Sequence, residues 1–238
     1  MDKYLYLTLI LFTISFPLIR SFEPKIQYAK KWYALFPAII ITGTLFVIWD
    51  HWFTVMGVWE FNPRYNMGIY ILDLPIEEWM FFIVVPFSCV FIYEVLNYFV
   101  EKDILGKIAK PLTVILVLCF VGIGLMNLDR MYTSVNFPIA AAVLIIHFML
   151  FGVKYLGRFY LTYLVHLIPF AIMNGILTGS FIEEPVVLYN NLENLSIRFF
   201  TIPVEDFVYS MTLLLINISI YEAIKNRKHF KLAKVNTL

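Results

Sequence analysis

The chain is 238 residues long, and 61% of its residues are hydrophobic while only 15% are charged. A globular domain has about 45–50% apolar and about 25% charged residues, so this composition excludes a soluble protein and predicts a surface that faces lipid. The formal net charge of +1 lacks the basic excess that a nucleic-acid partner requires. The two cysteines, Cys89 and Cys119, lie in apolar runs without ligand spacing, so we expect buried thiols, no disulfide and no metal site.

Apolar runs long enough to cross a bilayer recur seven times along the chain. A hydrocarbon core of about 30 Å takes roughly 20 helical residues. Runs near this length cover residues 4–19, 32–49, 76–100, 111–128, 135–151, 159–181 and 203–224. The first run follows a weakly basic start and no small-residue cleavage site follows it, so we predict a span of the mature protein rather than a signal peptide. The expected fold is an all-α integral membrane protein.

The basic residues divide unequally between the two sides that seven spans define. One side has four: Lys3, Arg64, Arg130 and Arg198. The other has fourteen: Arg20, Lys25, Lys30, Lys31, Lys102, Lys107, Lys110, Lys154, Arg158, Lys225, Arg227, Lys228, Lys231 and Lys234. Because basic loops stay in the cytoplasm, we expect a cytoplasmic C-terminus and an external N-terminus. The basic cluster at 225–234 is expected to contact anionic lipid.

The third and seventh spans open with the same acidic motif. The third begins Leu74-Pro75-Ile76-Glu77-Glu78-Trp79, and the seventh begins Ile202-Pro203-Val204-Glu205-Asp206-Phe207. A Tyr-Glu pair follows each motif, and its glutamate, Glu94 or Glu222, lies at the same distance from the proline in both copies. Upstream, Phe61-Asn62 and Tyr189-Asn190 keep the same spacing as the two motifs, and residues 35–37 resemble 167–169. The chain therefore contains an internal repeat.

This repeat predicts the organisation of the chain. Residues 1–100 form a first three-helix repeat, 101–133 a connector helix and 134–238 a second three-helix repeat. A single connecting span leaves the two copies parallel and related by an axis along the membrane normal. Both acidic motifs are then expected at the external end of their helices.

Acids at a helix start have two interpretations. Proline and acidic residues suit the first turn and complement the helix dipole. Alternatively, carboxyls at the edge of lipid are costly unless paired or protonated, and they mark a site. Further acidic or titratable side chains flank the motifs: Asp50, His51, Glu60, Asp73, Glu183 and Glu184. Two neighbouring carboxyls in an apolar setting cannot both ionise easily, so one could serve as an acid while another stays ionised.

Aromatic residues make up 18% of the chain. Several are expected near the level of the acids: Trp49, Trp52, Phe53, Trp59 and Phe61. They fit an interfacial belt, or the walls of a pocket that stabilises a developing cation. Glu94 and Glu222 lie roughly 25 Å further along their helices, where a structural role beside the basic loops is favoured over catalysis. His147 and His166 are expected to be satisfied interior residues rather than metal ligands.

The doubled motif closely resembles the heterodimeric-type lycopene cyclases, in the form that fuses both subunits in one chain. The residues that carry this resemblance are Phe61-Asn62-Pro63, the two Pro-x-Glu-acidic motifs and the pairs Tyr93-Glu94 and Tyr221-Glu222. It implies cyclisation of the linear ends of lycopene to β-ionone rings, giving β-carotene without a cofactor. The implied partners are a lipid-soluble carotenoid, membrane lipid and other carotenoid enzymes.

The resemblance also implies roles for individual residues. Glu77, Glu78, Glu205 and Asp206 would form the catalytic centre, where one carboxyl donates a proton and another stays ionised. Asp50, Asn62 and Asn190 are candidates for positioning. Trp59, Phe61, Tyr93, Glu94, Tyr221 and Glu222 are further supporting candidates. The second half has no clear counterpart of Asp50-His51, so one composite centre and two separate centres both stay open.

Other classes make different demands on the sequence. A proton-coupled transporter is the main alternative, although its polar groups would be expected near the middle of the membrane. A retinal photoreceptor needs a lysine in its last helix, and 203–224 has none. A prenyltransferase would be expected to have aspartate-rich motifs for diphosphate. A cyclase acting on another carotenoid, or forming ε rings, stays open.

Overall fold

The computed structural model describes the backbone of residues 2–235 and the side chains of residues 2–227. Its seven α-helices are α1 (Leu5–Arg20), α2 (Trp32–Val55), α3 (Ile76–Phe99), α4 (Gly106–Met126), α5 (Met131–Phe151), α6 (Leu156–Leu177) and α7 (Val204–Val235). Each contributes a segment long and apolar enough to cross a membrane within this described part of the chain. The prediction of a seven-span, all-α membrane protein is confirmed.

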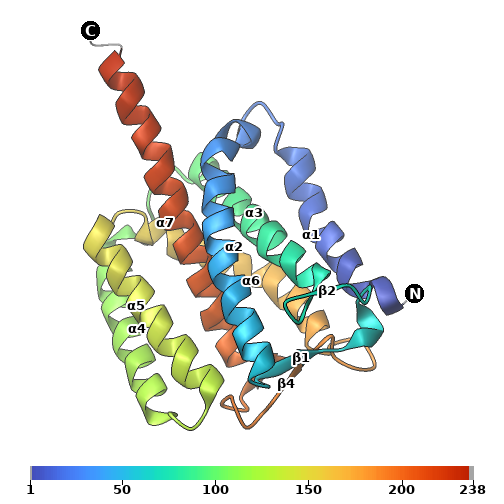
Figure 1. Cartoon of the computed structure of the whole chain (residues 1–238). Helices are drawn as coiled ribbons and strands as arrows, with labels where there is room; N and C mark the ends of the chain where they lie inside the picture. The colour runs from blue at the N-terminus through green and yellow to red at the C-terminus, as the bar shows by residue number, and fades with distance from the viewer. Residues whose placement is uncertain (1, 236–238) are drawn as a thin grey trace.

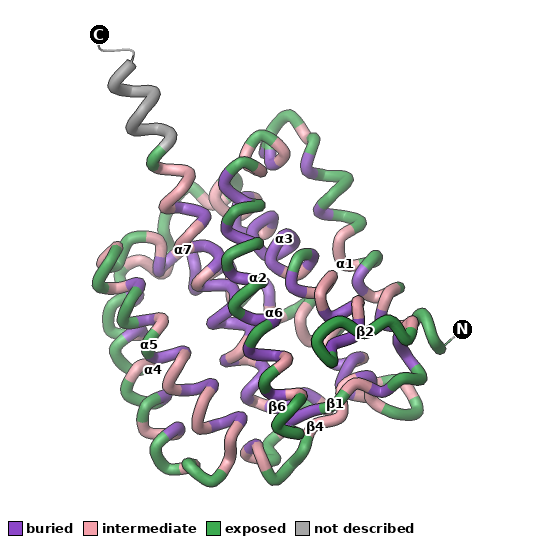
Figure 2. Tube along the Cα trace, in the orientation of Figure 1, coloured by how far each residue is buried: buried purple, intermediate pink, exposed green. Residues whose placement is uncertain are grey.

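The two halves of the bundle interlock through their second and third helices (Figure 1). In the first half α1 and α2 pack on α3, and in the second half α5 packs on α7. Across the halves, α2 packs against α7 and α6 packs against α3. As a result α3 and α7 are the most buried helices, whereas α1, α4 and α5 carry broad exposed faces (Figure 2).

The two connections that precede α3 and α7 contain the short strands. Strand β1 (Trp59–Phe61) pairs antiparallel with β4 (Val187–Tyr189), so that Trp59 faces Tyr189, and Phe61 faces Val187. Two hairpins follow, β2 (Tyr70–Ile71) with β3 (Leu74–Pro75), and β5 (Arg198–Phe199) with β6 (Ile202–Pro203). Short 3-10 helices occupy Asp2–Tyr4, Tyr28–Lys31 and Pro63–Tyr65.

The β1–β4 ribbon joins equivalent segments of the two repeats. The sequence offset that relates the first acidic motif to the second also relates Phe61 to Tyr189 and Glu60 to Leu188. Glu60 faces Leu188 in the ribbon, so the central pair joins two equivalent positions. The halves are therefore hydrogen-bonded to each other around their common axis.

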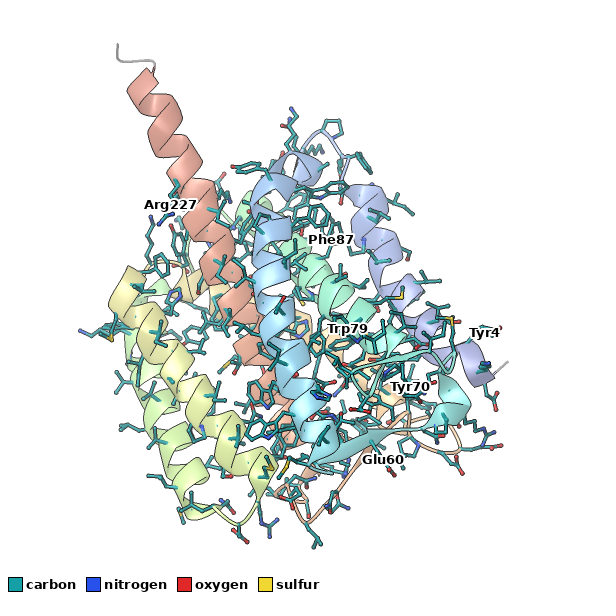
Figure 3. All side chains as sticks on the ribbon, in the orientation of Figure 1. Tyr4, Glu60, Tyr70, Trp79, Phe87 and Arg227 are labelled. Carbon is teal, nitrogen blue, oxygen red and sulfur yellow. The ribbon has the colours of Figure 1, made fainter. Side chains whose placement is uncertain are left out.

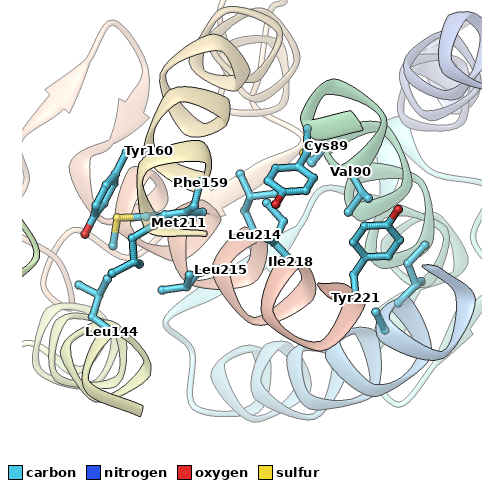
Figure 4. Close-up of a cluster of buried hydrophobic side chains, with 14 of the residues drawn as sticks. Cys89, Val90, Leu144, Phe159, Tyr160, Met211, Leu214, Leu215, Ile218 and Tyr221 are labelled. Atoms are coloured by element: carbon cyan, nitrogen blue, oxygen red, sulfur yellow. The ribbon is translucent and has the colours of Figure 1, made fainter. Parts of the chain in front are cut away.

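The largest apolar core lies between α7 and its neighbours (Figure 4). Met211, Leu214, Leu215 and Ile218 of α7 pack among side chains of α3, α5 and α6. Their burial anchors α7 in the centre of the bundle.

Elements at the two ends of the bundle differ in chemistry. The ribbon, the hairpins and the N-terminus share one end, and Figure 3 places Glu60 there and Arg227 at the opposite end. Lys225 precedes Arg227 by two residues on α7, and Lys31 and Lys225 bind the same carboxyl, that of Glu94, so both lysines also lie at the end opposite the ribbon. The side chains of Lys228, Lys231 and Lys234, which belong to the predicted lipid-contacting cluster, lie outside the described residues.

The structure departs from the sequence predictions in a few details. Helix α6 ends at Leu177, before the predicted end at Phe181, because the chain turns at Gly179 with φ of +112°. Cys119 is exposed, so the expectation of a buried thiol is wrong there, because α4 lies at the edge of the bundle. Cys89 is buried, as predicted.

The two mid-span histidines lie in the interior. His147 has both ring nitrogens hydrogen-bonded, to the Ser219 hydroxyl at 2.7 Å and to the Lys154 carbonyl at 3.0 Å. His166 contacts the Cys89 sulfur at 3.3 Å through Nδ1, while its Nε2 is buried without a hydrogen-bond partner among the described residues. The expectation of a fully satisfied side chain is therefore confirmed for His147 and wrong for His166, which faces apolar neighbours.

Candidate functional site

A cavity lies between the two repeats, at the end of the bundle that carries the β1–β4 ribbon. Every helix except α4 contributes to its walls, as do both strands of the ribbon. The lining residues are Tyr6, Asp50, Trp59, Phe61, Glu78, Phe81, Val85, Tyr132, Phe170, Asn174, Leu177, Val187, Tyr189, Asp206, Tyr209, Ser210 and Leu213. The walls are thus mostly apolar and aromatic, with three carboxyl groups among them.

The three carboxyls belong to different helices. Asp50 comes from α2, Glu78 from α3 and Asp206 from α7, and each residue is at most 6% exposed. Glu78 and Asp206 are the second acids of the two repeated motifs. The structure therefore brings the acids of both repeats to the same cavity.

Asp206 is surrounded by hydrogen-bond donors. The Tyr132 hydroxyl donates to Oδ1 at 2.6 Å, while Tyr189 and Asn174 donate to Oδ2 at 2.9 and 2.7 Å. Burial, and then the charge of Asp206, raises the pKa of Tyr189 well above its ordinary value. The phenol consequently keeps its proton and acts as a donor. Three neutral donors on one carboxyl form a setting that suits a carboxylate.

Glu78 has fewer partners than its counterpart. The Tyr6 hydroxyl donates to Oε2 of Glu78, and Asp50, on the helix α2 that packs against α3, lines the same cavity as Glu78. Oδ2 of Asp50 is buried and has no hydrogen-bond partner within the described part of the chain. The first half thus presents two neighbouring acids where the second half presents one acid and an amide.

The first acids of the two motifs point elsewhere. Glu77 accepts the backbone N–H of Met67 at 2.8 Å, and Glu205 accepts that of Leu195 at 2.8 Å. Neither glutamate lines the cavity. Glu205 also accepts a hydrogen bond from the Thr133 hydroxyl at 2.7 Å. Both glutamates fix the loop that leads into their own helix.

Asn62 and Asn190 form matching hydrogen bonds in these loops. Their side-chain oxygens accept the backbone N–H two residues later, at 3.0 and 3.1 Å. Their amides donate across the axis, Asn62 to the Pro185 carbonyl and Asn190 to the Gly57 carbonyl, both at 3.2 Å. The two asparagines tie the repeats together outside the cavity.

Aromatic rings enclose the carboxyls. Trp59 contacts Tyr132, Tyr189 and Tyr209 with ring centroids 5.1, 5.9 and 6.2 Å apart. Trp49 and Phe53 pack behind this group in the same buried cluster. Trp52, in contrast, is 45% exposed and fits an interfacial position. The aromatic residues therefore divide between the cavity and the surface.

The two Tyr-Glu pairs form a separate network at the opposite end of the bundle. Glu94 is 3% exposed; it forms a salt bridge with Lys31, and another with Lys225 at 2.6 Å. The Tyr221 hydroxyl donates to Glu94 at 2.7 Å. Glu222 binds Lys225 at 3.2 Å.

Tyr93 belongs to this same network through the Tyr221 ring, which lies 6.5 Å away between centroids. The network joins α3 to α7 and to the start of α2. None of its members lines the cavity.

The remaining flanking acids lie at the surface. His51 approaches Asp73 at 3.5 Å, and Arg64 binds Asp2 at 2.8 Å and Glu183 at 2.7 Å. The hydrogen bonds that the Arg64 guanidinium donates to Asp2 and then to Glu183 raise its pKa. Glu60 and Glu184 are also exposed.

Several cavity residues lacked a usable sequence signal. Tyr6 and Tyr132 lie on the first helix of each repeat and bind Glu78 and Asp206 in matching ways. Their separation differs from that of the acidic motifs, and they belong to no motif. Asn174 and Tyr209 likewise lie within apolar spans, where no motif marks them as site residues.

Fold and site together define a multi-pass membrane protein whose two repeats enclose an acidic, aromatic-walled cavity. The lycopene cyclase family model matches the chain over residues 3–96 and 129–224. The chain belongs to this family and is a carotenoid cyclase, an enzyme whose substrates are lipid-soluble. A search of curated proteins and a search of solved structures found no match.

Proposed function

We propose that the protein is a lycopene β-cyclase that isomerises the linear ends of lycopene to β-ionone rings and so forms β-carotene. The observation that supports this proposal is the cavity that Glu78 and Asp206 share, because protonation of an alkene needs an acid, and the cation that forms needs a negative charge to balance it in a dry, apolar setting. No electrons are gained or lost in this reaction, so these carboxyls suffice for its chemistry.

The proposed reaction begins with transfer of a proton to the terminal double bond. A new C–H bond forms and leaves a tertiary carbocation. The neighbouring double bond attacks this cation and closes the ring, and a proton then leaves a ring carbon. Asp206, held by Tyr132, Tyr189 and Asn174, is the carboxylate that balances the positive charge. The ring faces of Trp59 and its neighbours stabilise the cation as well.

A pigment assay in a lycopene-accumulating bacterium tests this function. The native chain and the variants Glu78→Gln and Asp206→Asn are expressed at equal membrane levels, and the carotenoids are separated by chromatography. Removing the acid, or the carboxylate that balances the cation, is expected to reduce product about a hundredfold or more. Glu60→Gln is the matched control, because Glu60 lies on β1 beside Trp59 and Phe61 but its side chain is exposed.

Each outcome of this assay has a definite meaning. β-Carotene from the native chain and from Glu60→Gln, but not from the two cavity variants, supports the proposal. Rings of the ε type would refute the β assignment. Unchanged lycopene with well-folded native protein would refute lycopene as the substrate and favour a cyclase that acts on another carotenoid.

We further propose that the N-terminus is external and the C-terminus cytoplasmic. The supporting pattern is the fourteen basic residues at the end that carries the C-terminus, against four at the ribbon end. Epitope tags at the two termini test it: the N-terminal tag is expected to be accessible in spheroplasts and the C-terminal tag only after permeabilisation. The reverse pattern would refute this orientation.

A further inference from the structure

We propose that Asp50 is a catalytic residue that shares one proton with Glu78, and that this pair is both the acid and the base of the cyclisation. The inference rests on the proposed function and assigns the roles within it. Asp206 then stays ionised throughout the cycle and never transfers a proton.

The first support is the hydrogen bonding of Asp50. Its carboxyl lines the cavity and is 4% exposed, yet Oδ2 contacts no donor within the described part of the chain. A buried polar atom without a partner is costly, and among the described residues the Asp50 side chain fixes no loop and caps no helix. A carboxyl that lines the cavity and has an unpartnered oxygen is available to transfer a proton.

The second support is the difference between the two halves. Asp50 on α2 lines the cavity with Glu78, whereas Asn174 on α6 lines it with Asp206 and donates to that carboxyl at 2.7 Å. Each of these side chains comes from the second helix of its repeat and shares the cavity with the second acid of its own motif. An amide cannot release a proton, so the second half can hold a charge but cannot share a proton as two acids can.

The neighbours of Asp50 are consistent with this division. The titratable groups that line the cavity with its carboxyl are Glu78 from α3, Tyr6 from α1, Tyr132 from α5, Tyr189 from β4, and Asp206 and Tyr209 from α7. Among the described residues that line the cavity, none is a lysine or an arginine. Two carboxyls without a neutralising cation cannot both ionise easily, so a proton stays with the pair.

The pair accounts for both proton transfers of the reaction. One carboxyl gives its proton to the terminal alkene carbon, and the pair becomes fully ionised while the tertiary cation exists. After ring closure the C–H bond at the ring carbon breaks, and its proton returns to the same pair. The enzyme is thereby reset without proton exchange across the cavity.

Two measurements on the full-length protein test the proposal. Infrared spectroscopy of the purified protein without substrate detects the C=O stretch of protonated carboxylic acids. A shared proton belongs to both residues, so the same band is expected to shift or vanish in Asp50→Asn and in Glu78→Gln. Asp206→Asn and the surface control Asp73→Asn should leave it unchanged. A band that Asp50→Asn does not alter would overturn the proposal.

The second measurement is the cyclisation rate in membranes. Asp50→Asn is expected to lower the rate about a hundredfold or more, and the double variant Asp50→Asn/Glu78→Gln should be no slower than the slower single variant, because the two act as a unit. If the rate loss in the double variant instead equals the product of the two single losses, the shared role is overturned. If the native chain makes no cyclic product the proposed function fails, yet the infrared band still decides whether the proton is shared.

Discussion

Glu94 provides a test of whether the second acidic network is structural. The variant Glu94→Gln keeps the shape of the side chain but removes the charge that binds Lys31 and Lys225. Breaking a fully buried ion pair is destabilising by about 3–5 kcal/mol, while an exposed pair contributes about 0–1 kcal/mol. The lysine side chains are 27% and 21% exposed, so part of their charge can be solvated, and we expect a loss of about 2–3 kcal/mol.

This loss corresponds to a measurable change in melting temperature. For a chain of this size, about 1 kcal/mol shifts the midpoint by about 2–4 °C, so Glu94→Gln is expected to melt roughly 4–12 °C lower in the same detergent. Glu222→Gln is the matched comparison. Glu222 contacts only Lys225 among the cations of the described residues, at 3.2 Å, and its loss should be smaller, about 1–2 kcal/mol.

Activity separates the structural interpretation from a catalytic one. Glu94 follows Glu78 on α3 at a distance of about 24 Å along the helix, from the rise of about 1.5 Å per residue. Below its melting temperature the Glu94→Gln variant should therefore convert substrate at a rate within a few-fold of the native rate. A variant that melts normally and forms no cyclic product would refute this reasoning and place Glu94 in the chemistry.

Two further predictions concern the second repeat. Glu205→Gln weakens the hydrogen bonds from Leu195 and Thr133 and should destabilise the protein by about 1–3 kcal/mol, measured by thermal unfolding; an unchanged midpoint would contradict the loop-fixing role. Tyr189→Phe removes one of three donors to Asp206, a hydrogen bond to a charged group worth about 1.5–3 kcal/mol, and should slow cyclisation about 10- to 150-fold. A native rate in this variant would show that the carboxylate does not depend on its donors.

The sequence was sufficient to predict the spans and the meeting of the two motifs. Hydropathy alone located seven helices, and the constant spacing between the two copies of the repeat placed Glu78 and Asp206 at one level of the bundle. The sequence could not show which of Glu77 and Glu78 faces the cavity. Successive residues on a helix point roughly 100° apart, so one acid of each motif had to leave the cavity, but which one depends on how the helices are rotated against each other.

The contribution of the other helices was harder to predict. Tyr6 and Tyr132 reach the acids from spans that carry no repeated motif, and only the packing of α1 on α3 and α5 on α7 brings them there. The pairing of β1 with β4 joins two very short segments, which carry no periodic signal. Long-range contacts of this kind follow from the assembled bundle rather than from local pattern.

The β1–β4 ribbon has a consequence for the purity of the product. A tertiary carbocation is readily trapped by water as an alcohol. The ribbon closes the cavity with backbone groups that satisfy one another, and it turns Trp59 and Phe61 inward while Glu60 stays outside. Under the proposed chemistry, this strand pair acts as a water seal. An enzyme with a loosened seal would form hydrated carotenoids alongside the ring, so under this chemistry the fidelity of the reaction depends on two short paired strands as well as on the acids.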